Sequence, residues 1–286
     1  MKTLQILFIF IVLLSSCKKD EVIVPGNNPP ADPTITNTVI ENYIHKVYIS
    51  LLGREPDSTE IANGLNILRV HNLSAADRSL LLDQILADTA YFSHQFQITN
   101  ADLLNDMDTA EVTQFITIFN ILLADSTNLP FFSVLNYEKN RLIDFQQTSD
   151  DYINGNVPLV DLQKVFIDNY FYDQINMGTL NFVVSMYQHF FTRYPSVNEL
   201  NAGISMVDGN IAIAFLQTGS SKQDFINIFF SSNDYYEGQV RSLYLRYLLR
   251  EPTSNELSDF TLQFASDKNF KALQKKILML DEFVFL

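Results

Sequence analysis

One stretch of sequence decides the fold: residues 47–61 read Val-Tyr-Ile-Ser-Leu-Leu-Gly-Arg-Glu-Pro-Asp-Ser-Thr-Glu-Ile. Residues 186–200 and 243–257 align with it without a gap. The three segments share a Tyr, an Arg, a Pro, a short polar residue and a Glu at fixed spacing: Tyr48, Arg54, Pro56, Asp57 and Glu60; Tyr187, Arg193, Pro195, Ser196 and Glu199; Tyr244, Arg250, Pro252, Thr253 and Glu256. So many matched positions within one chain indicate an internal duplication.

The shared residues predict a helix, a sharp corner and a second helix. The Tyr and the apolar residue four positions later lie on one helical face. The Arg falls near the helix C-terminus, where a cation is favourable, and the Pro cannot continue that helix. The short polar residue and the Glu three positions later form a capping box for the next helix. We therefore expect the Arg and the Glu to brace each corner. The alternative is a row of solvent-facing Arg side chains that binds an anionic ligand.

The remainder of the chain beyond residue 38 predicts helices, so the fold class is all-α, an array of helix–corner–helix repeats. Apolar residues recur at i, i+3 and i+4 spacing and do not alternate as in strands. Asp108 and Glu111 predict a further capping box. We expect a first repeat unit over residues 38–96, a divergent helical middle over 97–171, and the second and third units over 172–286.

Each unit also ends in a similar way. A bulky apolar pair is followed within a few residues by an acidic residue and an aromatic one, as in Asp88 to Tyr91, Asp234-Tyr235 and Glu282-Phe283. Residues 165–171 look like the end of a further, degenerate unit.

The corner resembles two families of domains of unknown function. The Leu52-Gly53-Arg54-Glu55-Pro56 corner is similar to the L-G-R-x-P-[ST]-x-x-E corner of a helical domain attached to planctomycete cytochrome-type proteins, and also to a domain of S-layer-like and calcium-repeat secreted proteins. The second unit departs from this pattern with Thr192 and Tyr194, and the third unit lacks the Gly. The resemblance covers about half of the chain. It implies a helical module of secreted, surface-located proteins and supplies no catalytic residue.

The N-terminus has the composition of a secretory signal. Lys2 precedes an apolar run from Leu4 to Leu14, which is shorter than the roughly 20 residues that span a bilayer. Leu14-Ser15-Ser16-Cys17 resembles a bacterial lipobox, in which the Cys becomes the first mature residue and carries the lipid. We therefore expect a signal peptide over residues 1–16 and lipidation, including palmitate, at Cys17, the single Cys of the chain.

Residues 17–37 hold the lipidated Cys and a Pro-rich flexible linker, which reaches at most about 70 Å when fully extended. Lys19-Asp20-Glu21 resembles the surface-export signal of some Gram-negative lipoproteins. These features predict a protein that is lipid-anchored in the outer membrane and exposed at the cell surface. The covalent lipid is its contact with the membrane.

Charge and composition exclude several classes of function. The 33 acidic residues outnumber the 19 basic ones, for a net charge of -14, and a nucleic-acid partner needs a basic face instead. No two of the four His residues lie at i, i+4, and the single Cys is assigned to the lipid, so we expect no metal site and no cofactor. The sequence contains no P-loop, no G-x-S-x-G and no G-x-G-x-x-G.

These patterns favour a binding or scaffolding role toward an unknown protein or glycan, with no catalytic residue assigned. One alternative is an extracytoplasmic glycan-processing enzyme whose paired carboxylates meet only in the folded chain. A second alternative is a purely structural component of the envelope. Four tripeptides resemble a bacterial O-glycosylation sequon: Asp57-Ser58-Thr59, Asp88-Thr89-Ala90, Asp108-Thr109-Ala110 and Asp125-Ser126-Thr127.

Overall fold

The computed structural model describes residues 35–286, so the predicted signal peptide, Cys17 and nearly all of the linker lie outside the described residues. Within this range the chain forms fifteen α-helices, one short 3-10 helix and two strands of three residues each. The predicted all-α fold is confirmed. Residues Thr36–Leu286 form one compact unit.

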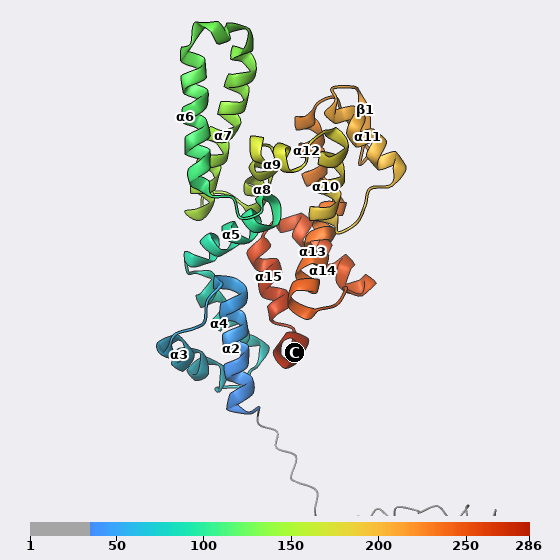
Figure 1. Cartoon of the computed structure of the whole chain (residues 1–286). Helices are drawn as coiled ribbons and strands as arrows, with labels where there is room; N and C mark the ends of the chain where they lie inside the picture. Colours follow the sequence, from blue (N-terminus) through green and yellow to red (C-terminus); the bar gives the residue numbers. More distant parts are fainter. Residues whose placement is uncertain (1–34) are drawn as a thin grey trace, which may run out of the picture. The chain divides into compact units, whose positions relative to one another are not determined.

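The first of the three aligned segments lies in a group of four helices (Figure 1). They are α2 (Asn37–Leu52), α3 (Ser58–Leu68), α4 (Ala75–Leu86) and α5 (Ala90–Leu104). Helix α2 packs against α3, α4 and α5 and buries seven residues along one face. The corner between α2 and α3 coincides with the aligned segment.

The middle of the chain forms a long antiparallel hairpin and two short helices. The hairpin consists of α6 (Thr109–Ala124), the 3-10 helix η1 (Ser126–Phe131) and α7 (Phe132–Ile153). Figure 1 shows α6 and α7 side by side and extending away from the neighbouring helices. The short helices α8 (Leu159–Ile167) and α9 (Tyr170–Ile175) follow and pack against α7 and α5.

The second and third aligned segments lie in the C-terminal half. The second spans α10 (Thr179–Phe191) and α11 (Val197–Val207), which are followed by strands β1 (Ala212–Ala214) and β2 (Gln217–Gly219) and by α12 (Lys222–Ser231). The third spans α13 (Asn233–Leu248) and α14 (Ser254–Asp267), which are followed by α15 (Phe270–Leu278) and α16 (Asp281–Phe285).

The three segments share one order of packing. In each, the first helix packs against the second across the corner and also against a fourth helix further along the chain: α2 with α5, α10 with α13, and α13 with α16. Helix α13 therefore closes the second group of helices and opens the third. The close approach of α10 and α13 depends on Gly238, because a Cβ placed there would lie 1.9 Å from the carbonyl oxygen of Phe190.

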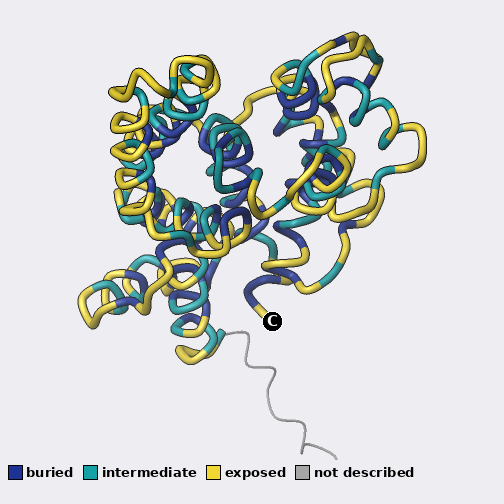
Figure 2. The backbone as a smooth tube through the Cα atoms, turned by 45° about the horizontal axis from the view of Figure 1, so that its top comes forward, coloured by how far each residue is buried: buried dark blue, intermediate teal, exposed yellow. Residues whose placement is uncertain are grey.

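The first and third groups of helices also share a core. The Tyr43 hydroxyl of α2 donates to the carbonyl of Leu278, and the Tyr91 hydroxyl of α5 donates to the Gln274 side chain. Arg78 of α4, which is 6% exposed, forms an ion pair of 2.6 Å with Asp281. Since α13 also contacts α10, the third group of helices contacts both of the others. Figure 2 shows the buried residues along the helix faces that meet one another.

One local prediction, the capping box at Asp108, differs from the structure. Asp108 caps α6 by accepting from the amide of Ala110, but Glu111 does not close a capping box there. The predicted unit boundary at residue 96 lies inside α5, and the one at residue 171 lies inside α9. The first helix begins at Asn37, one residue before the predicted start.

The β-hairpin formed by β1 and β2 was not predicted from the sequence. Its two-residue turn, Phe215-Leu216, has φ angles of 49° and 63°, a conformation that usually selects Gly or Asn. The Phe215 ring packs at 6.1 Å from Tyr187 and 5.8 Å from Phe229. Tertiary packing of this ring therefore fixes a turn that the local sequence does not favour.

The distal part of the α6–α7 hairpin exposes a group of large apolar side chains: Ile118, Ile121, Leu122, Leu129, Phe131, Val134 and Tyr137. Among the helices of residues 35–286, none is by itself long and apolar enough to cross a membrane. Within the same described residues, α6 taken together with Ser126–Ile153, a pair bent by 111°, meets the length and composition criteria.

Candidate functional site

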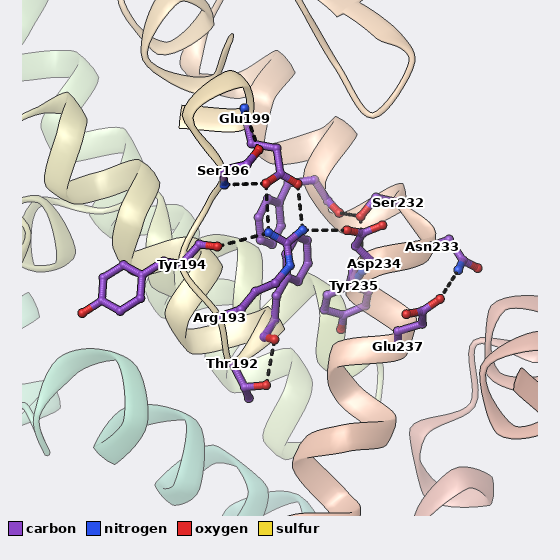
Figure 3. A network of polar contacts seen from close by, with 12 residues as sticks. Thr192, Arg193, Tyr194, Ser196, Glu199, Ser232, Asn233, Asp234, Tyr235 and Glu237 are labelled. Atoms are coloured by element: carbon purple, nitrogen blue, oxygen red, sulfur yellow. Dashed lines mark hydrogen bonds and ion pairs between the residues drawn. The ribbon is translucent and has the colours of Figure 1, made fainter. Parts of the chain in front are cut away.

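The three corners place their shared residues in the same arrangement. At the second corner, Arg193 donates from its two terminal nitrogens to the two carboxylate oxygens of Glu199, at 2.9 and 2.7 Å (Figure 3). The same two-point pairing joins Arg54 to Glu60, at 2.7 Å for both bonds, and Arg250 to Glu256, at 2.9 and 2.8 Å. Such paired hydrogen bonds fix both side chains in one geometry.

Each Glu also starts the second helix of its corner. Asp57, Ser196 and Thr253 are the N-cap residues, and at all three positions the capping box is complete. One carboxylate oxygen of the Glu accepts from the backbone amide of the N-cap residue at 2.7–2.8 Å while it also accepts from the Arg. The guanidinium therefore binds the same carboxylate that caps the helix.

The Arg is held from two further sides. Its guanidinium lies over the ring of the shared Tyr, with distances of 5.6, 5.1 and 5.2 Å at Tyr48, Tyr187 and Tyr244. One terminal nitrogen donates to the backbone carbonyl of the following residue at each corner. The three Arg side chains are 34–43% exposed and do not extend freely into solvent.

A second carboxylate reaches each corner from the start of the fourth helix. Asp88 lies 3.8 Å from Arg54, Asp234 lies 3.0 Å from Arg193, and Glu282 lies 2.6 Å from Arg250. These three acidic residues belong to the similar unit endings. The sequence displayed both patterns, but their contact across 32–41 residues is visible only in the folded chain.

The pKa values follow from this pairing. The hydrogen bonds from Arg193 and Arg250 lower the pKa of Glu199 and Glu256 to about 2, and that from Arg54 lowers the pKa of Glu60. Each corner thus satisfies its own charges. The Arg side chains are occupied by internal carboxylates, and this arrangement favours a bracing role over an anion-binding one.

A buried ionic cluster, which the sequence did not predict, joins α7, α9 and α12. Arg141, 7% exposed, lies 2.7 Å from Asp173, and Lys222 lies 2.6 Å from the same carboxylate. Asp168 lies 3.7 Å from both cations. Burial raises the pKa of Asp168 and of Glu138, which lies 3.3 Å from Arg141.

A cleft of about 430 Å³, here called the aromatic cleft, opens on the described part of the chain. It lies between α5, the loop before α8, and helices α13 to α15. Seven aromatic side chains line it: Tyr91, Phe92, Tyr152, Tyr235, Tyr236, Phe264 and Phe270. Asp267, Lys268 and Lys271 supply its charges.

Lys271 connects the two sides of the aromatic cleft. Its ammonium lies 4.5 Å from the Tyr91 ring and 4.0 Å from the Phe92 ring, and it donates to the carbonyl of Leu86 at 2.9 Å. Burial lowers its pKa. This cleft was not predicted from the sequence, because its residues come from segments up to 180 positions apart and carry no local pattern.

The described residues show no group of three or more His, Cys, Asp or Glu side chains placed to hold a metal ion. Comparison with protein-family models, with curated proteins and with solved structures finds no match to this chain. The two resemblances drawn from the corner therefore stay predictions.

Proposed function

We propose that the protein is a surface-exposed lipoprotein of the outer membrane whose helical body binds a partner through the aromatic cleft and does not catalyse a reaction. The observation that carries the binding role is the composition of this cleft. Three of its aromatic rings, those of Phe92, Tyr236 and Phe270, are partly exposed and offer apolar contact, and the charged and polar groups at its edge supply orientation.

The carboxylates of the aromatic cleft support binding over hydrolysis. Glycoside hydrolysis uses two carboxyl groups that flank the scissile bond, about 5–9.5 Å apart. Among the described residues that line this cleft, Asp267 is the single carboxylate. A ligand held there would meet aromatic faces and two lysines, which suits recognition.

The anchoring part of the proposal rests on the sequence. Cys17 follows a lipobox-like tripeptide, and the compact unit begins at Thr36, so the residues between them separate the body from the lipid. Lys19-Asp20-Glu21 supports display on the outer face. The test is a membrane fractionation of cells that express the wild type or Cys17→Ser, together with protease added to intact cells.

We expect the wild type to sediment with the outer membrane and to be degraded by the added protease. Cys17→Ser should leave the membrane fraction or accumulate as the precursor. Replacement of residues 19–21 by Ala should protect the protein from the protease while it remains membrane-bound. A wild type that is fully protected in intact cells would place the protein in the periplasm and contradict surface display.

One observation favours the alternative of a glycan-processing enzyme. Burial raises the pKa of Asp168 and Glu138, and a raised carboxyl pKa is one requirement of a general acid. The nearby Arg141 and Lys222 nevertheless pair with these groups as in a structural cluster. If the alternative is correct, the wild type releases reducing ends from a polysaccharide and Asp168→Asn does not; we expect no release from either.

A further inference from the structure

A second cleft, of about 290 Å³, adjoins the aromatic cleft, with which it shares Leu159 and Phe270. Its walls come from α5, α8, α10, α13 and α15. We call it the amide cleft, because four of its lining residues are glutamines: Gln95, Gln163, Gln188 and Gln239. Thr99 and Ser242 add two hydroxyl groups.

Three of the four amides are buried, and the hydrogen bonding of Gln95 is incomplete. Gln95 is 3% exposed, and its side-chain nitrogen has no hydrogen-bond partner among the described residues. Gln239 is 7% exposed, and neither its amide oxygen nor its amide nitrogen is among the buried side-chain atoms that lack a partner in residues 35–286. Gln163 accepts from the Tyr235 hydroxyl at 2.7 Å, and this bond uses only its oxygen.

Buried amides without partners are rare, because water hydrogen-bonds to them fully in the unfolded chain. Apolar residues of the same size would fill this space at lower cost. The amides of α5, α8, α10 and α13 that line this cavity offer hydrogen-bond donors and acceptors to a ligand that carries hydroxyl groups.

The charges of the amide cleft indicate an uncharged ligand. Its one cation and one carboxylate, Arg246 and Asp102, form an ion pair of 3.2 Å with each other. His189 shares a hydrogen bond of 3.1 Å with Tyr172, and burial lowers the pKa of this His, so the neutral imidazole is favoured. An ionic ligand would find no unpaired opposite charge there.

We propose that the amide cleft binds one neutral, polyhydroxylated ring of a glycan, whose neighbouring residues lie along the aromatic cleft. An amide group both donates and accepts, as a sugar hydroxyl does, so each glutamine can pair with either side of a hydroxyl. The C–H face of a sugar ring is apolar and packs on an aromatic side chain, and Phe270 borders both clefts.

The arrangement fits a glycan better than a peptide. An extended peptide is bound chiefly through its backbone, at a sheet edge or along a groove with regular spacing. Here the polar groups are side-chain amides on different helices around a compact cavity. This proposal deepens the proposed function and rests on its binding role, because it names the ligand class of the same surface.

The experiment uses the full chain purified in detergent. It is applied to an array of neutral and acidic oligosaccharides, and calorimetry then measures the affinity for the best neutral ligand. The variants are Gln95→Leu and Gln239→Leu, with Gln147→Leu on the exposed surface of α7 as the matched control. Thermal melts without ligand accompany each variant.

We expect both cleft variants to weaken binding at least tenfold and the control to bind as the wild type does. We also expect Gln95→Leu to melt no lower than the wild type, since it removes an unpartnered buried amide. Phe270→Ala should weaken binding as well, and it serves as a second probe if a Gln variant does not fold.

Several results would overturn the proposal. They are a folded wild type that binds no neutral oligosaccharide, cleft variants that bind as the wild type does, and a preference for acidic glycans. Binding of a peptide library that Gln95→Leu abolishes would replace the glycan with a peptide. None of these outcomes depends on where the protein resides, so failure here remains distinct from failure of the fractionation test.

Discussion

Replacement of Arg250 by Ala tests whether the three corners brace the fold. Arg250 binds Glu256 and Glu282, each through two hydrogen bonds of 2.6–2.9 Å, and its guanidinium lies 5.2 Å from the Tyr244 ring. At 34% exposure, solvent screens these interactions in part. We assign about 1 kcal/mol to each two-point pair, at the upper end for exposed ion pairs, and about 0.5 kcal/mol to the ring contact. The expected loss of stability for Arg250→Ala is therefore about 2–3 kcal/mol.

The other two corners give an internal scale for this estimate. Arg193 has one two-point partner and a single bond of 3.0 Å to Asp234, whereas Arg54 lies 3.8 Å from Asp88, beyond hydrogen-bond distance. The loss of stability should therefore be largest for Arg250→Ala, smaller for Arg193→Ala and smallest for Arg54→Ala, at about 1–1.5 kcal/mol.

The assay is thermal and urea denaturation of the purified protein, followed by circular dichroism in the far ultraviolet. A loss of about 2 kcal/mol lowers the Tm of a domain of this size by about 4–8 °C. Arg250→Lys should recover less than half of the loss, because an ammonium cannot pair with two carboxylates in the planar geometry of Arg. The control is Arg241→Ala, which removes a surface pair with Glu251 and should cost less than about 0.5 kcal/mol. If all three corner variants have the same Tm as this control, the bracing role is wrong.

Three further predictions concern the backbone and the pH dependence. Leu249→Gly should stabilise the protein by about 0.5–1 kcal/mol in urea titrations. Leu249 is 78% exposed, so little packing is lost, and its left-handed φ of 55° costs a non-Gly residue about 1–2 kcal/mol. A loss of stability in this variant would show that the φ angle is not strained. Glu256→Gln should destabilise at pH 7 but converge with the wild type near pH 2. The pKa of Glu256 is about 2 in the folded state and about 4.5 in the unfolded chain. The stabilisation by its ionised carboxylate is therefore complete above pH 4.5 and is lost as the pH falls from about 4.5 to about 2. A stability difference between variant and wild type that does not change with pH would rule this out. Gly238→Ala should lower stability by at least about 1–3 kcal/mol, because its Cβ would meet the Phe190 carbonyl oxygen at 1.9 Å. Gly64→Ala, whose Cβ would meet side-chain atoms of Ile44 at 2.7–3.5 Å and no backbone atom, should cost less in the same melts.

The helices and corners were predictable from the sequence because their signals are local. Capping boxes at Asp57, Ser196 and Thr253 involve residues three positions apart, and the Pro of each corner cannot continue the preceding helix. The same reasoning failed at Asp108, where Glu111 leaves the cap incomplete. The β-hairpin was missed because its turn is fixed by the packing of Phe215 and not by turn-forming residues.

The candidate site was not predictable in this way. Gln95 and Gln239 lie on helices α5 and α13, and each has an unremarkable place in its own helix. They become neighbours in one cleft because the third group of helices packs against the first through contacts such as Tyr91 with Gln274. Asp88, Asp234 and Glu282 likewise appeared in the sequence only as parts of the similar unit endings, and their contacts with the corner Arg side chains were not predicted.

The sequence by itself determined the helical class, the positions of the three corners and the expectation of a lipid-anchored chain. Each of these follows from residues within about one helical turn or one short segment of each other, where spacing alone sets the geometry. The tertiary structure decided which carboxylates meet each Arg, which group of helices lies next to which, and where buried amides converge. Those contacts join residues up to 240 positions apart, as between Tyr43 and Phe283, and apolar helix faces of similar composition do not specify their partners until the whole core is packed.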